Sequence, residues 1–232
     1  MFISNKLVSV IFKLIIIIIC SIGLYRTSGM ANAEKKKKDI KNISVLIIYF
    51  TNLSNLLCLI YFFTSSIFMV FDIINHGVTG SAAVLFPQFK GAVVLCLLIT
   101  LLVYNFLLVP QRKKEPSNDS NVSFDFTDIC VHYIVPILSF SDWVLFDEKN
   151  VYTLFSPFLW IIIPLLYFVF ILIRAKFGDN LKAANSKYPY FFIDVDKIGI
   201  KRVLINTAIL CVIFVILGYL ILFFGYLLRV IK

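Results

Sequence analysis

The stretch that decides the fold is VLINTAILCVIFVILGYLILFFGYLLRV, at residues 203–230. It is strongly apolar and carries no charged residue before Arg229. A helix needs about 20 such residues to cross the roughly 30 Å of bilayer hydrocarbon, where each backbone polar group must be bonded within the segment. We therefore predict a transmembrane helix here.

Five other runs meet the same criterion, and the composition agrees with them. The chain is 60% hydrophobic and 15% charged, with a mean hydropathy of +0.94, whereas about a quarter of a soluble domain is charged. We predict an all-α polytopic integral membrane protein, with one domain over residues 1–232 and six transmembrane helices in one bundle. The expected spans are residues 7–25, 43–70, 92–109, 129–146, 153–173 and 203–230.

The first run also has to be compared with a cleaved signal peptide. The residues after it, Ser21-Ile22-Gly23-Leu24, match a small-residue cleavage site poorly, so a retained helix is favoured. Lys13 interrupts this run and is expected either to reach an interface or to pack inward. Charge in the middle of the other spans is expected to be nearly absent.

The distribution of basic residues predicts the orientation. Sixteen Lys and Arg fall in the loops at residues 26–42, 110–128 and 174–202, and five fall on the opposite side. The positive-inside rule therefore places these loops in the cytoplasm and both termini outside the cell membrane. The net charge of +9 indicates contact with anionic lipid, and no basic domain with interleaved aromatic residues suggests nucleic-acid binding.

The cysteines and histidines argue against metal and disulfide chemistry. All five cysteines lie in or at the ends of apolar runs without CxxC spacing, so buried free thiols are expected. The two histidines are far apart and buried carboxylates are few, which leaves too few ligands for a metal. No cofactor is expected.

Polar side chains inside two spans are the candidates for function. The heptapeptide Tyr49-Phe50-Thr51-Asn52-Leu53-Ser54-Asn55 places Thr51, Ser54 and Asn55 on one side of a helix. Such groups must face protein or a cavity. They serve either as bonds between helices or as a site, and the sequence leaves both interpretations open.

The fourth span carries a second polar face. His132, Pro136, Ser139 and Trp143 share it, with Asp142 at its edge. An ionisable residue within a span is a functional hypothesis, although a neutral histidine bonded to a neighbouring helix, and Asp142-Trp143 as an interface anchor, are alternatives. Thr51 and His132 lie at comparable depths, and a histidine can activate a hydroxyl as a nucleophile.

These residues belong to a longer series of motifs. The motifs are Tyr49-Phe50-Thr51-x-x-Ser54-Asn55, Lys90-Gly91-Ala92-Val93, Tyr104-Asn105, His132-x-x-x-Pro136, Asp142-Trp143 and Tyr188-Pro189-Tyr190-Phe191-x-x-Asp194. The series resembles the small six-helix bacterial "Pr-six-Pr" membrane proteins. It is similar in layout to the animal androgen-induced membrane proteins, which are membrane threonine hydrolases that cleave fatty acid esters of hydroxy fatty acids.

The resemblance implies a hydrolase of a lipid or fatty-acid ester, with Thr51 as nucleophile and His132 as base. Asn55, Ser54, Trp143 and Asp142 are then expected to support the substrate or the oxyanion. The partners would be membrane lipids and an acyl-chain substrate, and the oligomeric state stays open. The alternative is a non-enzymatic six-helix membrane protein, such as a small transporter, a sensor or an assembly partner.

Overall fold

The computed structural model describes residues 2–27, 43–80, 84–114, 126–181 and 184–231, without the side chains of residues 43–45 and 113–114. Within these residues the chain is all-α, and extended pairing is limited to two isolated bridges. Six helical stretches are long and apolar enough to cross a membrane, which confirms the predicted fold class and the multi-pass character. They are Lys6–Thr27, Phe50–His76, Pro87–Arg112, Phe126–Phe146, Ser156–Phe177 and Ile200–Val230.

The chain forms two compact units, Met1–Val151 and Tyr152–Lys232. Four of the six spans belong to the first unit and two to the second.

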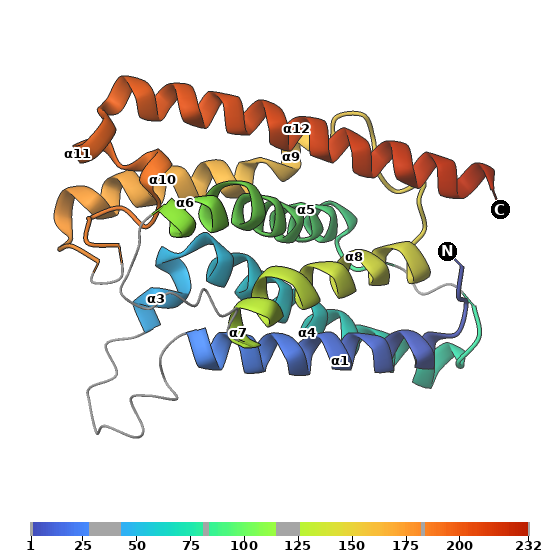
Figure 1. The fold of residues 1–232 in the computed structure, drawn as a ribbon. Helices are drawn as coiled ribbons and strands as arrows, with labels where there is room; N and C mark the ends of the chain where they lie inside the picture. The colour runs from blue at the N-terminus through green and yellow to red at the C-terminus, as the bar shows by residue number, and fades with distance from the viewer. Residues whose placement is uncertain (1, 28–42, 81–83, 115–125, 182–183, 232) are drawn as a thin grey trace, which may run out of the picture. The chain divides into compact units, whose positions relative to one another are not determined.

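In the first unit four spans pack side by side (Figure 1). The span of α1 packs against α4 and α8, and α5 packs against the same two helices, so the four form a closed ring. The elements are α1 (Lys6–Thr27), α3 (Ile43–Ile48), α4 (Phe50–His76), α5 (Pro87–Val103), the π-helix η1 (Tyr104–Leu108), α6 (Val109–Lys114), α7 (Phe126–Ile129), the π-helix η2 (Cys130–Ile134) and α8 (Val135–Phe146).

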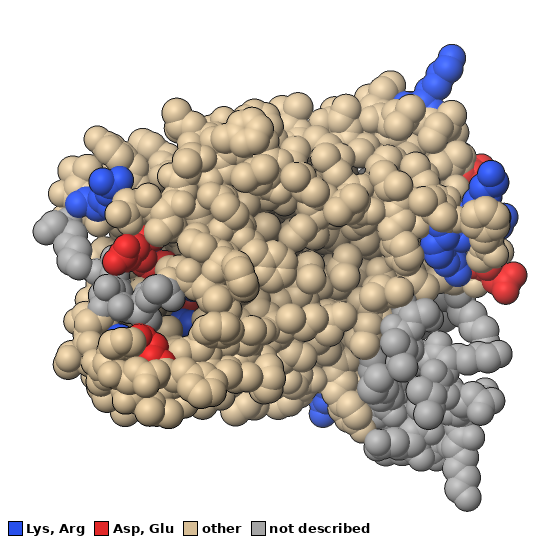
Figure 2. Space-filling model, turned by 180° about the vertical axis from the view of Figure 1, so that it is seen from behind, with Lys and Arg blue, Asp and Glu red and all other residues tan. Residues whose placement is uncertain are grey.

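Apolar side chains fill the centre of this ring. Ile16, Cys20, Phe62, Leu97 and Val135 are buried against one another. Large apolar side chains on the outer faces stay exposed, as a bilayer requires. Much of the face drawn in Figure 2 likewise shows no charged residue.

Two span boundaries differ from the prediction in ways that matter for the site. The third span begins at Pro87 and not at residue 92, so Lys90, which the prediction placed in an outer loop, lies inside a span and is buried. The second span is interrupted at Tyr49, whose backbone is extended with φ −95° and ψ 125°. Tyr49 therefore separates α3 from α4, and the polar heptapeptide begins a helix and does not lie within one.

Among its described residues, the second unit contains two spans and two short helical elements between them. Its elements are α9 (Ser156–Trp160), α10 (Ile162–Phe177), the 3-10 helix η3 (Phe191–Ile193), α11 (Val195–Ile198) and α12 (Ile200–Val230). The helix α12 packs on α9, and a Cβ placed on Gly218 would lie 2.8 Å from the Cβ of Pro157. A glycine at this contact allows the two backbones to approach closely.

The five cysteines are free thiols, as expected. Four are buried, and Cys211 is half-buried.

Candidate functional site

Thr51 lies in the first turn of α4, directly after the break at Tyr49. Its side chain is half-buried. The N-terminus of a helix carries the positive end of the helix dipole, which favours negative charge placed near it. The break therefore places a hydroxyl group in an environment that stabilises an anion.

Two neighbours of Thr51 are engaged in bonds between helices. The Ser54 hydroxyl lies 2.9 Å from the hydroxyl of Thr100 on α5. The Asn55 amide donates to the carbonyl of Thr51 at 2.8 Å and to the carbonyl of Val131 at 3.1 Å. Ser54 and Asn55 thus link α4 to α5 and to η2, and an oxyanion role for Asn55 would require it to give up one of these bonds.

His132 is held in η2 by partners on two sides. Its ring stacks on Tyr104 of η1, with centroids 3.7 Å apart. Its Nε2 lies 3.9 Å from an Asp128 oxygen, one turn earlier in the same span. The other oxygen of Asp128 accepts from Arg112 at 3.0 Å, so the carboxylate is itself oriented.

The remaining nitrogen of His132, Nδ1, is buried and has no hydrogen-bond partner in the described part of the chain. A buried polar group without a partner is uncommon and costs free energy. A substrate or a neighbouring hydroxyl group could provide the missing bond.

Two π-helical segments meet at this histidine. Besides the stacking of Tyr104 on His132, the Tyr133 hydroxyl donates to the side-chain oxygen Oδ1 of Asn105 at 2.7 Å. A π-helix shifts the register of a helix locally and is frequent at functional sites. Here one such segment on each of two neighbouring spans turns His132 and Tyr104 toward each other.

Thr51 and His132 lie on adjacent elements at the same level. Because one Asn55 nitrogen bonds the carbonyls of Thr51 and Val131, those oxygens lie within about 6 Å of each other. No hydrogen bond joins the Thr51 and His132 side chains in the described residues. The structure thus brings their backbones together without a bond between the two side chains.

Asp142 and Trp143 lie away from His132. Asp142 follows His132 by ten residues, which is about 15 Å along a helix axis. Its two oxygens bind Lys13 of α1 at 2.7 Å and Lys90 of α5 at 2.5 Å. Trp143 is buried beside it, with the Lys149 ammonium 4.6 Å from its ring centroid. Neither residue contributes to the surroundings of His132 described above.

Lys13, Lys90, Asp142 and Asp147 form a charge cluster. Lys90 also binds Asp147 at 2.6 Å, and the four side chains are at most 4% exposed. Lys13 therefore packs inward, while Lys90 and Asp142 are buried near the ends of their spans and Asp147 directly follows α8. The physical reason is mutual neutralisation, because two ammonium groups and two carboxylates can share a buried space at zero net charge.

Asp147 and Lys149 lie beyond the end of α8, and the pKa of each is shifted from its ordinary value. Burial raises the pKa of Asp147 above its ordinary value; Asp142 acts in the same direction and Lys90 opposes it. Burial lowers the pKa of Lys149 to about 8. The Lys149 ammonium donates to carbonyls at the end of α8, including that of Asp147 at 2.7 Å.

Sequence reasoning missed Asp128 and Tyr104 at the histidine, and Lys90 and Asp147 in the charge cluster. The four-residue spacing of Asp128 and His132 was a usable signal, since it places both on one face of a helix. The contacts of Lys90 join residues more than fifty positions apart, and no local pattern reports them.

Comparison with protein-family models, curated proteins and solved structures finds no match to this chain. The resemblance of its motifs therefore stays a prediction.

Proposed function

We propose that this chain is an integral membrane hydrolase that cleaves a lipid or fatty-acid ester with Thr51 as nucleophile and His132 as base. The observation that carries the proposal is the pair of hydrogen bonds that the Asn55 amide donates to the backbone carbonyls of Thr51 and Val131. It holds the start of α4 beside the segment that presents His132. The buried Nδ1 of His132 without a partner adds support, because a base must have a nitrogen free to accept a proton.

The reaction follows from these roles. His132 takes the proton of the Thr51 hydroxyl as its oxygen attacks the ester carbonyl carbon. The ester C–O bond then breaks, the alcohol leaves with the proton from His132, and the acyl group stays on Thr51. Water, deprotonated by His132, cleaves this acyl ester, releases the fatty acid and restores the hydroxyl group.

Asp128 and the start of α4 would assist this chemistry. Asp128, 3.9 Å from Nε2, is a positioning residue that orients the imidazole and stabilises its protonated form. The N-terminus of α4 is placed to stabilise the oxyanion, since donors and dipoles aimed at developing charge lower the barrier. In this arrangement Ser54 and Asn55 hold the helices around the site.

The site suits a substrate with acyl chains. The half-buried Thr51 lies where α4 begins, and apolar helices surround it. Under the predicted orientation, this end of the unit faces the cytoplasm. The ester would lie at that interface while its chains stay in hydrocarbon.

A fluorophosphonate probe tests the nucleophile. Purified full-length protein in lipid vesicles is expected to become labelled on Thr51, with labelling lost in Thr51→Ala, retained in Thr51→Ser, and reduced about 100-fold or more in His132→Gln. Thr64→Ala and His76→Gln are the matched controls, since Thr64 bonds its own helix and His76 is exposed. Undiminished labelling of Thr51→Ala would refute the assigned nucleophile.

A second candidate function is a small membrane transporter or sensor without hydrolytic activity. The charge cluster favours it, because ionisable groups within spans mark ion and proton pathways. Complete absence of labelling and of ester turnover in folded wild-type protein would favour this candidate over the hydrolase.

A further inference from the structure

The two carboxylates of the charge cluster, Asp142 and Asp147, differ in their hydrogen bonds. Both oxygens of Asp142 accept from ammonium groups, one from Lys13 and one from Lys90. Asp147 accepts from Lys90 through one oxygen only. Its other oxygen, Oδ2, is buried and has no partner among the described residues. Asp147 is therefore the member of the cluster with an open position for a proton.

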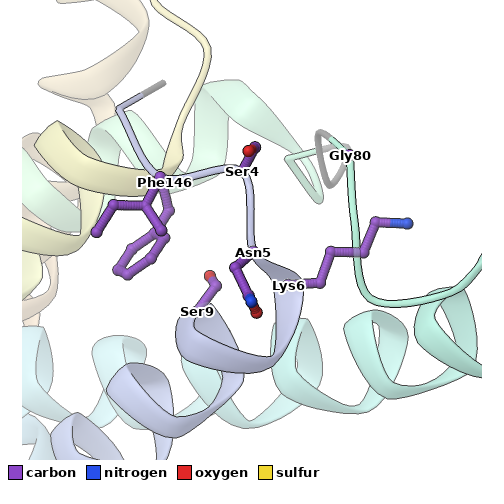
Figure 3. Close-up of a pocket in the computed structure, with 7 residues that line it drawn as sticks. Ser4, Asn5, Lys6, Ser9, Gly80 and Phe146 are labelled. Carbon is purple, nitrogen blue, oxygen red and sulfur yellow. The ribbon is translucent and has the colours of Figure 1, made fainter.

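A hydrogen-bonded path connects the cluster to a small pocket. Lys13 donates to the hydroxyl of Ser9 at 2.8 Å, and Ser9 lines the pocket together with Ser4, Asn5 and Phe146 (Figure 3). About 10 Å³ is open to the centre of a water molecule there, which is about the room that one water needs. A water bound to the Ser9 hydroxyl would be two hydrogen bonds from Lys13, with Ser9 between them.

Aromatic rings surround the two ammonium groups. Lys13 lies 5.2 Å from the ring centroid of Phe146, and Lys90 lies 5.7 Å from that of Phe62 and 5.9 Å from that of Tyr61. The faces of such rings attract positive charge. They therefore stabilise a state in which the cluster carries one positive charge in excess.

We propose that the charge cluster is a proton-binding site, filled from the pocket at Ser9, with the proton held on Asp147. Lys13 first passes a proton to Asp142; the neutral amine then takes the proton of the Ser9 hydroxyl, which a water in the pocket replaces. Lys90 passes a proton to Oδ1 of Asp147, and its neutral amine takes the proton of Asp142 after that carboxylic acid has turned its O–H toward Lys90. Ser9, both ammonium groups and the Asp142 carboxylate return to their starting states. Asp147 ends as a carboxylic acid, and the net charge of the cluster changes from zero to +1.

The other charged groups around Asp147 are consistent with this uptake. Lys90 faces it from α5, Lys13 from α1, Asp142 from α8 and Lys149 from the segment after α8. Burial raises the pKa of Asp147, so the folded state takes up this proton at a higher pH than an exposed aspartate would. The proposal is independent of the hydrolase, because the cluster does not contact Thr51 or His132.

Infrared difference spectroscopy tests the site on the full-length protein in lipid vesicles as the pH is lowered from neutral. A carboxylic-acid C=O band is expected to appear, to shift with ¹³C-aspartate and to be lost in Asp147→Asn. Asp72→Asn is the matched control, since Asp72 is partly exposed and pairs with Lys6 and His76. It is expected to retain the band.

Two further variants keep the test decisive. Asp147→Glu retains a carboxyl group and is expected to move the band, which decides the matter if Asp147→Asn does not fold. Ser9→Ala is expected to slow proton uptake, and an unchanged rate would overturn the Ser9 route. Absence of any such band, or a band that persists in Asp147→Asn, would overturn the proton site and leave a structural ion-pair cluster.

Discussion

Lys90 donates to Asp142 at 2.5 Å and to Asp147 at 2.6 Å, and all three side chains are buried. A buried ion pair contributes little net stability, because the loss of hydration offsets the attraction. Removal of one partner has a large effect, since the opposite charge then remains without compensation. The contribution of each charged residue in the cluster therefore depends on the others being present.

Lys90→Met is expected to lower the free energy of unfolding by about 3–5 kcal/mol, because it leaves Asp147 without its ammonium partner. The measurement is the unfolding transition of the purified protein in detergent, followed by helix content. Lys197→Met is the control: Lys197 is 60% exposed and 3.7 Å from Asp194, so a change within about 1 kcal/mol is expected. Equal stability of the two variants would contradict the buried pairing.

At the scale of single elements, the local irregularities of the helices position the candidate site. The break at Tyr49 begins α4 beside Thr51, and η2 turns His132 onto Tyr104. The sequence 43–70 contains neither Gly nor Pro, so the usual signals of a helix break are missing. Packing against neighbouring spans decides where the helices depart from regular geometry.

The contact of α1 with η2 depends on Gly23. A Cβ at this position would lie 2.7 Å from Cγ1 of Val131, and a valine side chain has little freedom to turn aside. Gly23→Ala is therefore expected to destabilise the protein by about 1–3 kcal/mol through overpacking. The same unfolding measurement checks it.

Ile22→Ala is the matched control, because the neighbouring Ile22 is exposed on the outer face. Its unfolding transition is expected to stay close to that of the wild type. If the Gly23→Ala protein were as stable as Ile22→Ala, the prediction would be contradicted, because η2 could then move away from α1 without a loss in the free energy of unfolding.

At the scale of the whole molecule, the two polar regions of the first unit lie at opposite ends of its spans. His132 belongs to the beginning of the fourth span, and the charge cluster gathers at its end, near the start of α1 and of α5. Lys90 is buried within a span and therefore does not belong to the predicted outer loops. The predicted orientation places His132 toward the cytoplasm and the charge cluster toward the outside.

Cysteine labelling tests this orientation. An impermeant maleimide added to intact cells is expected to label His76→Cys and not Lys197→Cys, and both positions are exposed, at 71% and 60%. The wild-type chain controls for the native thiols. Labelling of Lys197→Cys alone would reverse the orientation and place the site of His132 on the outer side.

The six spans and the all-α class could be predicted from the sequence, because a bilayer imposes length and apolarity on each segment separately. The sequence also identified Thr51 and His132 as candidates, since each polar residue within an apolar run can be recognised without knowledge of its partners. Only the tertiary structure decided that Asn55 joins their helices, that Asp128 and Tyr104 hold His132, and that Asp142 belongs to the charge cluster with Lys13, Lys90 and Asp147. The physical reason is that hydrophobicity acts on each segment independently, whereas hydrogen bonds and ion pairs join residues far apart in the chain and depend on how the helices pack.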